Sequence, residues 1–536
     1  MARQKGLTKS LLLVTLLAAT LISGCGGPDK KPGSVINRGL GGDIDTLDVH
    51  RARSTQSHRV QDDILQGLLG YSANGTLEPG VAREWDVSPD GLLYSFSLRQ
   101  NARWSNGDPV TANDFVVSLR RLVDPNTAGF YATFVSVIEN AERITTGELP
   151  PETLGVFALD DYTLEIRLSR PTPYFPQLLT HPATSPVHSP SLEKYGSQFA
   201  RAENIVTNGP YKVDQYVMSS KLSLSRNPYY WDNENTSIDR VNYLAITDNS
   251  VEYTLYRTGE LDITFGVAPG QFHTIREERP TELRVAPQLG LYYYGLNLTK
   301  PPFAGNKQLR QAVSMAIDRE LLVAKVSGRG EVAAYSWVPP GIDGYQSEQF
   351  DYASMPRDER LAIARTLYQE AGYTEENPLK FELRYNTGEF ESTMAVAIQS
   401  MWRTNLGAEV ELINEEFQVL LSNIQMMEIT QAYRLSWIGD YNDADTYLQL
   451  MMTGNPMNLT GYSNETVDSL LAQASTELSL EKRQRLMRQA ERILLDDHPA
   501  IPLYYYVSKH LVNPKIQGWE DNVLDRHPTK HLSIAE

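Results

Sequence analysis

The chain has 536 residues and a formal net charge of −17, from 66 acidic and 49 basic side chains. So acidic a protein argues against nucleic-acid binding, which needs a basic footprint. The length exceeds what one hydrophobic core supports, so we expect two or three domains. The single cysteine, Cys25, excludes an intramolecular disulfide and a cysteine-based metal cluster.

The first residues have the pattern of an export signal. Three basic residues lie within the first nine positions, and an apolar run follows over 11–22, too short for a comfortable membrane span. Small residues before Cys25 resemble a lipoprotein signal, in which cleavage precedes the cysteine and its thiol is acylated. We therefore predict a signal peptide over 1–24 and a solvated tether over 25–34; an ordinary exported protein with an incidental cysteine is the alternative. Cleavage would remove three positive charges, so −17 becomes −20.

The rest of the chain alternates strand and helix patterns, which predicts an α/β fold. In chain order we expect a strand and turn at 35–49, helices at 62–69 and 112–122, a strand at 291–298, helices at 307–325 and 357–371, a strand at 379–385, a helix at 394–406, strands at 409–414 and 434–438, a helix at 482–496 and a strand at 501–507.

One stretch, 434–445 with the sequence RLSWIGDYNDAD, combines a guanidinium, an indole and three carboxylates. Its first five residues alternate as a strand does, and Gly439 then permits a turn at Asp440. An acid just past a strand end, near a cation such as Arg434, can hold a ligand that carries both charges, as a peptide does. A solvated acidic turn beside a core tryptophan is the alternative. A calcium loop fits less well, because Ala444 breaks the D-x-[DN]-x-[DN]-G pattern.

The sequence contains no recognised catalytic motif. HExxH, GxSxG and the P-loop pattern are absent, and the S-x-x-K match at 191–194 lacks its companion motifs S-D-N and K-T-G. The nine histidines are scattered along the chain. We therefore predict a protein that is not an enzyme and that has no cofactor and no metal site.

Several longer motifs occur in the order typical of one family. They are IDTLDVH (44–50), NARWSNGDPVTANDF (101–115), DPNTA (124–128), ALDDYTLE (158–165), NIVTNGPY (204–211), RNPYYWD (226–232), AIDRE (316–320), AGY (371–373) and WIGDYNDADTYL (437–448). With these motifs the chain, from about residue 35 to its end, resembles the oligopeptide-binding proteins of ABC importers, the extracytoplasmic solute-binding proteins of family 5 (peptide/nickel type).

The resemblance implies an α/β, periplasmic-binding-protein-like fold, with two lobes in three domains, a hinge and an interlobe ligand cleft. The implied division is lobe I from 35–65, 190–289 and 508–536, a small second domain from 66–189, and lobe III from 290–507, with hinges near 289–291 and 506–508.

The resemblance also implies a ligand site. Asp440 would take the ligand ammonium, and Arg434 the carboxylate of a short ligand. An extended peptide would pair with two flanking strand segments, Arg53–Gln56 and Leu435–Ile438. The implied ligand-binding residues are Asp440, Arg434, Trp437, Ser436, Ile438, Arg53, Ser54, Thr55, Tyr131 and Tyr293.

Three residues depart from the family pattern. Ala444 replaces a common proline, Glu391 stands where some relatives carry a basic residue for the carboxylate of longer peptides, and Gly295 stands where an acid can occur. The preferred peptide length and side chains therefore stay open.

The implied function is that of a lipoprotein receptor on the periplasmic side of the cell envelope, which binds extended oligopeptides and delivers them to an ABC-type permease. Its expected partners are the peptide, the permease subunits and the membrane through the lipid on Cys25; we expect a monomer. Alternatives are a receptor of the same fold for a cell-wall peptide, metal chelate, haem or sugar, an exported hydrolase, or a structural or signalling lipoprotein that has lost transport.

Overall fold

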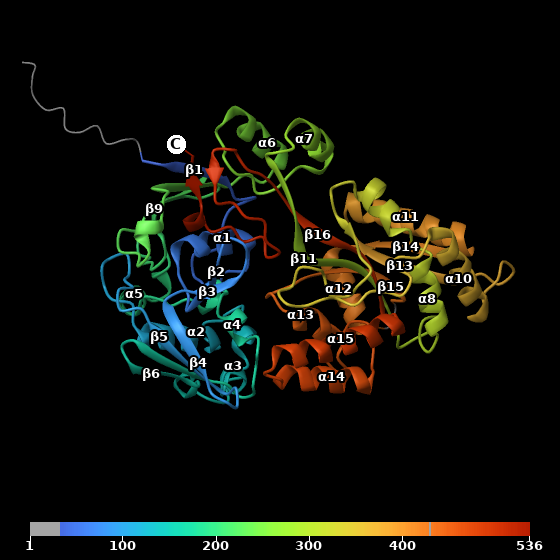
Figure 1. Cartoon of the computed structure of the whole chain (residues 1–536), viewed down its shortest axis with the longest axis horizontal. Helices are drawn as coiled ribbons and strands as arrows, with labels where there is room; N and C mark the ends of the chain where they lie inside the picture. The colour runs from blue at the N-terminus through green and yellow to red at the C-terminus, as the bar shows by residue number, and fades with distance from the viewer. Residues whose placement is uncertain (1–32, 428–429, 536) are drawn as a thin grey trace, which may run out of the picture.

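The computed structural model describes residues 33–427 and 430–535. They form two lobes joined by two long antiparallel strands, β11 (Leu283–Leu296) and β16 (Ala500–Leu511), which cross between the lobes (Figure 1). The predicted signal peptide, Cys25 and most of the predicted tether lie outside the described residues. Within the described ranges, no helix is both long and apolar enough to cross a membrane.

The first lobe contains two four-stranded sheets. In spatial order, one consists of β1 (Val35–Gly39), β10 (Arg240–Leu244), β9 (Lys221–Arg226) and β8 (Tyr211–Val217), and the other of β4 (Ala82–Val87), β5 (Leu93–Leu98), β7 (Thr163–Arg167) and β6 (Val156–Asp160). Polar and apolar residues alternate along β5, so Tyr94, Phe96 and Leu98 are buried on one face. Helices α1 (Thr55–Ile64) and α2 (Ala112–Val123) pack in the same core.

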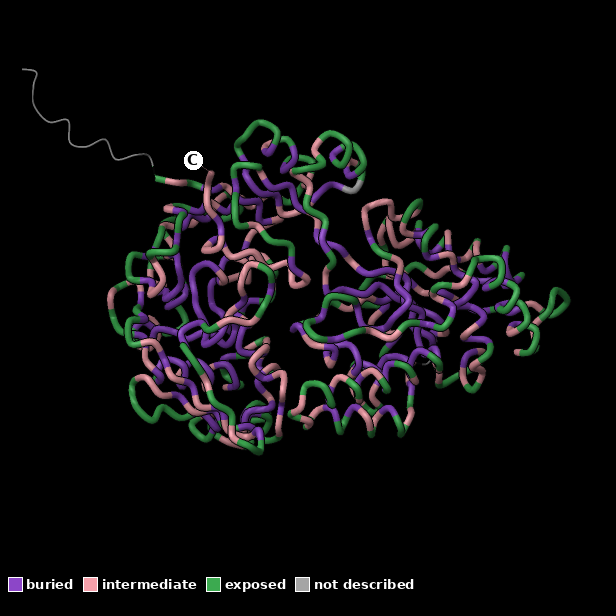
Figure 2. The backbone as a smooth tube through the Cα atoms, in the orientation of Figure 1, coloured by how far each residue is buried: buried purple, intermediate pink, exposed green. Residues whose placement is uncertain are grey.

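The second lobe is built on one six-stranded mixed sheet. Its spatial order is β12 (Val332–Ala333), β16, β11, β15 (Ala432–Ile438), β13 (Lys380–Asn386) and β14 (Glu409–Glu415). The long helices of this lobe are α8 (Lys307–Met315), α10 (Arg357–Glu370), α11 (Glu389–Leu406) and α15 (Leu480–Asp497). The buried residues form a separate core in each lobe, and the strands that cross between the lobes are themselves largely buried (Figure 2).

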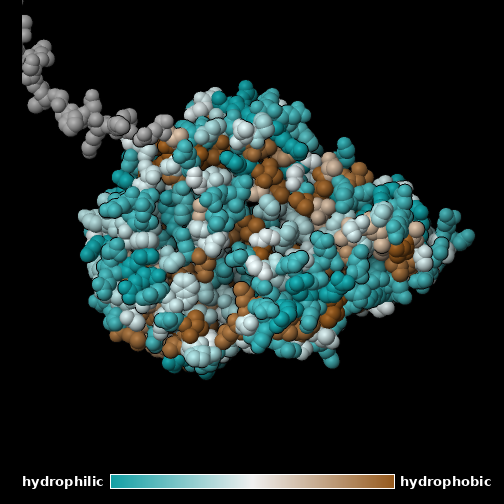
Figure 3. Space-filling view, viewed as in Figure 1, coloured by the Kyte–Doolittle hydropathy of each residue, from teal (hydrophilic) through white to brown (hydrophobic). Residues whose placement is uncertain are grey.

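Shorter elements complete the two lobes. The helices are α3 (Ala141–Thr145), α4 (Phe175–Leu178), α5 (Ser189–Tyr195), α6 (Asn249–Thr258), α7 (Phe272–Glu278), α9 (Arg319–Leu321), α12 (Phe417–Met426), α13 (Asp445–Leu448) and α14 (Glu465–Thr476), and the strands are β2 (Leu69–Tyr71), β3 (Leu77–Pro79), β17 (Ile516–Gln517) and β18 (Ser533–Ile534). Hydrophilic side chains cover most of the visible surface, and hydrophobic ones gather along the junction between the lobes (Figure 3).

Most of the predicted strands and helices of the second lobe are confirmed within a few residues, but two predicted helices are wrong in part. The helix expected at 62–69 overlaps α1 only at 62–64, because α1 begins at Thr55, where the Ser54 hydroxyl caps it, and ends at Ile64, and Leu69 already belongs to β2. The helix expected at 307–325 is broken after Met315. Asp318 accepts the Leu321 N–H (3.0 Å) and so starts a new short helix, α9.

The ladder between β11 and β16 is interrupted where the strands pass from one lobe to the other. It runs from Leu283 opposite Leu511 to Gly295 opposite Ala500, with a register shift between Pro287 and Leu291. Both predicted hinge stretches overlap or adjoin this interruption.

Gly290 lies at the interruption. A Cβ atom there would come within 2.7 Å of Ile438 Cδ1 and 2.8 Å of the Tyr506 ring, so a larger residue would displace both side chains. A C-terminal segment also contacts both lobes near this point. Val523 accepts a hydrogen bond from Leu289 N–H (2.8 Å) and packs on the core of the second lobe, while Asp525 pairs with Arg59 of the first (2.6 Å).

Candidate functional site

Three carboxylates follow strand β15, and the structure gives them different partners. Asp443 forms a two-point ion pair with the buried guanidinium of Arg483, at 2.6 and 2.8 Å. Asp445 accepts a hydrogen bond from the Tyr441 hydroxyl (3.0 Å). Within the described residues, the Asp440 carboxylate has no hydrogen bond and no ion pair. Only one of the three is therefore free to bind a ligand cation.

The backbone around Asp440 is fixed on both sides. Gly439 N–H donates to Leu289 C=O (2.8 Å), and Asp440 N–H donates to Thr446 Oγ1 (3.4 Å). A Cβ atom at position 439 would lie 3.0 Å from the Tyr447 hydroxyl, so the chain turns here with little room for a side chain. The turn that the sequence predicts after the strand is confirmed, and it holds Asp440 in a defined position.

The environment of Asp440 disfavours its charge. The carboxyl reaches solvent, but the protein around it removes enough water that burial raises its pKa from 3.8 to about 6. The Tyr131 hydroxyl, in the first lobe, has a raised pKa because of its own burial and then because of the negative charges of Asp440 and Asp45. Asp440 therefore lies near enough for its charge to act on Tyr131, although the two residues belong to different lobes.

A pocket of about 330 Å³ adjoins Asp440, and both lobes line it. The second lobe contributes Trp437, Asp440 and Tyr441; the first contributes Phe134, Arg170 and Tyr174, among others. No local pattern in the sequence links these three first-lobe residues to Asp440. A cavity of this volume fits a side chain or a small ligand.

Two aromatic rings connect the lobes beside this pocket. Tyr174 and Tyr441 stack with their centroids 5.1 Å apart and their planes within 4° of parallel. The Arg483 guanidinium lies 5.6 Å from the centroid of the Tyr174 ring. The lobes thus touch at one edge of the site while the Asp440 pocket remains open.

The free edge of β15 is the second feature of the site. Strand β13 pairs with β15 only at Ala432 and Tyr433. The Gly439–Leu289 hydrogen bond fixes the antiparallel ladder with β11, so the peptide groups of Ser436 and Ile438 point away from β11. Beyond Tyr433 no strand in the described part of the chain pairs with these groups on that side. An extended chain can add there as a strand.

Arg434 lies further along the same strand, and it is not a free cation. Its guanidinium donates to Asn386 Oδ1 (3.1 Å), lies 3.7 Å from Glu391 Oε1 and covers the Tyr292 ring at 4.6 Å. Its Nε has no hydrogen-bond partner among the described residues. Ser436 lies two residues further along the strand, so its side chain is on the same face of β15 as that of Arg434.

The prediction that Arg53–Gln56 is a strand is wrong. Ser54 is the N-cap of α1, and its hydroxyl accepts the backbone N–H three residues on (3.2 Å); Thr55 is the first helical residue. The Asp45 carboxylate stabilises this conformation, because it accepts hydrogen bonds from Arg53 N–H (2.8 Å) and from the Ser54 hydroxyl (2.6 Å). This local hydrogen bonding competes with strand pairing. The Arg53 guanidinium lies over the Phe130 ring at 4.9 Å.

The other predicted site residues lie at different depths. Trp437 lines the Asp440 pocket, and Ile438 is about half exposed at the strand end. Tyr131 belongs to an aromatic cluster with His181, whose ring centroid is 4.2 Å away. Tyr293 is buried against Trp337 (4.9 Å) and is not among the residues that line the pocket.

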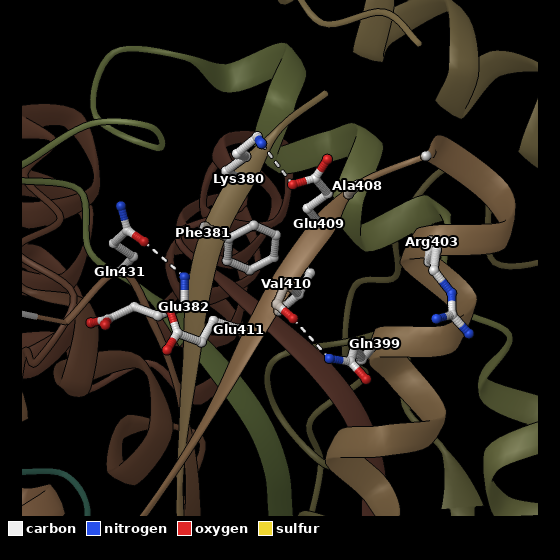
Figure 4. Close-up of a pocket in the computed structure, with 11 residues that line it drawn as sticks. Lys380, Phe381, Glu382, Gln399, Arg403, Ala408, Glu409, Val410, Glu411 and Gln431 are labelled. Carbon is white, nitrogen blue, oxygen red and sulfur yellow. Dashed lines mark hydrogen bonds and ion pairs between the residues drawn. The ribbon is translucent and has the colours of Figure 1, made fainter. Parts of the chain in front are cut away.

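A larger pocket, of about 600 Å³, lies at the outer edge of the second lobe along β13 and β14 (Figure 4). Several of its polar groups already bind one another. The pairs are Lys380–Glu409 (2.7 Å), Gln399 Nε2–Val410 O (2.7 Å) and Gln431 Oε1–Glu382 N (2.8 Å). Because these groups are satisfied and the pocket is far from the lobe junction, we do not take it as the ligand site.

One cluster of possible metal ligands lies in the C-terminal part of the described residues. Ligand atoms of His510, Asp525 and His527 lie within 4.8 Å of one another. The Arg59 guanidinium already pairs with Asp525, at 2.6 Å. That cation disfavours a second one, so the geometry indicates an ion-pair network.

Comparisons with known proteins bear on this architecture. The model for bacterial extracellular solute-binding proteins, family 5 Middle, matches residues 76–458. The periplasmic oligopeptide-binding protein OppA of Salmonella typhimurium is 38% identical over 543 residues, which cover 99% of each chain. The fold is therefore that of a two-lobe solute-binding protein. The chain belongs to the family 5 bacterial extracellular solute-binding proteins, which confirms the family predicted from the motifs.

Two solved structures illustrate the similarity. The murein tripeptide-binding protein MppA, in its unliganded open form, has a TM-score of 0.87 at 35% identity, over 94% of this chain and 98% of that chain. Haemophilus influenzae OppA in complex with RPPGFSPFR has a TM-score of 0.75 at 35% identity, over 94% of this chain and 100% of that chain.

The unpartnered Asp440 predicts an effect on stability without any ligand. Its folded-state pKa of about 6 lies above the ordinary 3.8, so its contribution favours folding below pH 4 and is lost as the pH rises through 6. Asp440→Asn should therefore raise the free energy of unfolding at pH 7, by about 1 kcal/mol once solvent screening is allowed for. The gain should disappear below about pH 4.

Denaturant unfolding across this pH range measures the difference. Asp86→Asn, which removes an exposed carboxylate from β4, is the matched control and should show no such trend. Destabilisation by Asp440→Asn at every pH would mean that Asp440 supports the fold.

Proposed function

We propose that the protein is an extracytoplasmic receptor that binds oligopeptides in an extended conformation and delivers them to an ABC-type permease. One observation carries the proposal: Asp440 is an acid that no cation among the described residues pairs with, and it lies beside a free strand edge between two lobes. A peptide supplies both missing partners, an α-ammonium for the carboxylate and a backbone for the strand. The names of the similar proteins, oligopeptide-binding and murein tripeptide-binding, support the same class of ligand.

The geometry suggests how the peptide lies. Its ammonium would pair with Asp440, and its backbone would bond to the free peptide groups of Ser436 and Ile438. The peptide would then run along β15 toward Arg434, antiparallel to the strand. Its first side chain would have the pocket of about 330 Å³ available. None of these contacts depends on a particular side chain, which suits a receptor for many peptides.

Arg434 would meet the carboxylate of a short peptide. Arg434 lies four residue steps before Ile438 along the strand, which is about 13 Å at about 3.3 Å per residue. A peptide of three or four residues spans that distance. Glu391 already faces the guanidinium at 3.7 Å, so a ligand carboxylate there would meet an opposing negative charge. We propose that this pair reduces the advantage that Arg434 gives to short peptides.

Closure of the lobes would complete the site. The chain is more similar to the open, unliganded MppA structure than to the peptide complex of Haemophilus influenzae OppA, at equal sequence identity. This supports an open arrangement of the lobes here. We propose that they move about the interrupted ladder near 289–291 and 506–508. Lobe I would comprise 35–65, 190–289 and 508–536, the second domain 66–189, and lobe III 290–507.

We further propose that the protein binds without catalysis and is a lipoprotein. The similar proteins are named as binding proteins, and the sequence contains no catalytic motif. The basic start, the apolar run and the small residues before Cys25 support a lipid on that thiol, with the receptor on the periplasmic side of the cell envelope. One acyl chain binds a membrane weakly, so stable anchoring needs more than one.

The first test is of this anchor. Cys25→Ser removes the acceptor thiol, so the variant should move from the detergent phase to the aqueous phase on Triton X-114 partitioning. Gly27→Ser adds a hydroxyl to the same tether and leaves the thiol in place, so it should still partition with detergent. Retention of the Cys25→Ser variant in the detergent phase would refute lipidation at this position.

The second test is of the ammonium contact. Asp440→Asn keeps the size of the side chain but removes its charge. Loss of one partner from a desolvated ion pair typically costs about 2–5 kcal/mol, which is about one and a half to three and a half decades in Kd. Calorimetry with trialanine and with N-acetyl-trialanine, on wild type and variant, gives a double-mutant cycle.

We expect the two changes together to cost less than the sum of the single changes. Asp86→Asn should leave both peptides unaffected, because it lies in β4 of the first lobe. Additive losses would show that Asp440 and the ammonium act independently.

A further inference from the structure

The two lobes touch at a place that is separate from the crossing strands. The loop between α14 and α15 of the second lobe reaches the first lobe (Figure 1). Leu478 belongs to this loop and is 45% exposed, and a Cβ atom added at Gly91 of the first lobe would lie 2.8 Å from its Cδ2. A side chain of the second lobe therefore rests on the backbone of the turn between β4 and β5.

Tyr441 makes a second contact of this kind, and it follows Asp440 directly in the chain. Only 6% of its surface is exposed, and its ring belongs to the hydrophobic core of the first lobe. Besides stacking on Tyr174, the ring lies edge-on to Phe134, with centroids 6.4 Å apart. The residue after Asp440 is thus buried in the opposite lobe.

The second lobe fixes the position of the Tyr441 ring. Its hydroxyl donates to Asp445 Oδ2 (3.0 Å) and accepts from Gln449 Nε2 (3.3 Å). The two-point ion pair between Asp443 and Arg483 attaches the same turn to α15. Because the ring and the turn are held together, a movement of the first lobe against the ring acts on the whole turn.

Tyr174 is the first-lobe residue that receives these contacts. It directly precedes α4, and its half-buried ring packs on the core of the first lobe. The same ring contacts both Tyr441 and the Arg483 guanidinium. Its hydroxyl forms no hydrogen bond in the part of the chain that the structure describes. The ring itself, rather than the hydroxyl, therefore connects the lobes.

We propose that this contact is a latch, which keeps the lobes together at one edge before any ligand binds. The latch consists of Tyr441, Leu478 and Arg483 of the second lobe and Tyr174 of the first. Because the crossing strands and the latch both connect the lobes, their relative movement in the free protein is restricted. Part of the ordering that a ligand would otherwise impose is then present in advance, which favours binding. Tyr174 is a positioning residue, because it acts on a ligand through the turn that carries Asp440.

The distance between the lobes in the free protein tests the latch without any ligand. Double electron–electron resonance on the full chain measures it, with Cys25→Ser as the parent and spin labels at the exposed positions Glu142→Cys in α3 and Glu465→Cys in α14. Tyr174→Leu removes the stacking ring, so the distance distribution should broaden and shift to longer distances. Tyr174→Phe keeps the ring and should reproduce the distribution of the parent.

Two further variants complete the distance measurement. Leu478→Ser should shift the distribution in the same direction as Tyr174→Leu, and its exposure makes it safe for folding. Tyr195→Leu is the matched control, because Tyr195 is also a half-buried tyrosine on the core of the first lobe, and it should change nothing. Parent-like distances in Tyr174→Leu and Leu478→Ser would overturn the proposal, as would a shift in Tyr174→Phe. If Tyr174→Leu does not fold, Leu478→Ser decides.

The effect on affinity rests on the proposed function and is measured separately, by calorimetry with trialanine. Tyr174→Leu should raise Kd by about 2- to 12-fold, the range that one aromatic pair contributes, and Tyr174→Phe should not. An unchanged Kd, or a higher Kd without a change in the distances, would refute the link between the latch and binding. No binding of trialanine to the parent would refute the proposed function, and the distances would still decide whether the latch exists.

Discussion

The fold holds the carboxylate of Asp440 in a place where water is partly excluded, and no residue in 33–427 or 430–535 supplies a cation to it. The two neighbouring acids do have partners, because Arg483 pairs with Asp443 and Tyr441 donates to Asp445. The closeness of the three carboxylates therefore does not explain the position of Asp440. The turn at Gly439 prevents Asp440 from relaxing toward another partner. A charge kept in this way is costly for the folded chain and useful only when a ligand neutralises it.

The arrangement of the two lobes follows from the same constraint. An ammonium that meets Asp440 in open water gains little, whereas the same pair gains much more when the lobes exclude water. The first lobe therefore has to reach the carboxylate, and Tyr131 and Tyr174 show that its aromatic residues already lie close to the site. The two crossing strands keep the lobes attached, and we propose that the interrupted ladder between them is the place where the lobes move.

Local sequence was enough to predict the strand and the turn that place Asp440. The alternation at 434–438, the glycine after it and the following acid predicted β15, the turn and the position of Asp440 correctly. The segment Arg53–Gln56 was wrongly predicted as a strand, because its polar residues also suit a helix N-cap. The hydrogen bonds of Asp45 stabilise the N-cap conformation. Here side-chain hydrogen bonds from a neighbouring turn determined the structure.

Other features depend on contacts that a sequence does not display. The pairing of Arg434 with Glu391 joins β15 to the first turn of α11, 43 positions apart in the numbering. Tyr174 reaches the Asp440 pocket from the other lobe, and no local pattern in the sequence links the two residues. The helix breaks after Met315 because Asp318 caps a new helix. The apolar spacing of 307–325 predicted one continuous helix and does not indicate this break.

The most direct measurement is a crystal structure of the protein with trialanine bound. The account predicts closed lobes, the ligand ammonium within hydrogen-bond distance of Asp440, and the ligand backbone paired with Ser436 and Ile438 along the free edge of β15. A peptide bound with its ammonium elsewhere, or with its carboxylate end toward Asp440, would contradict it.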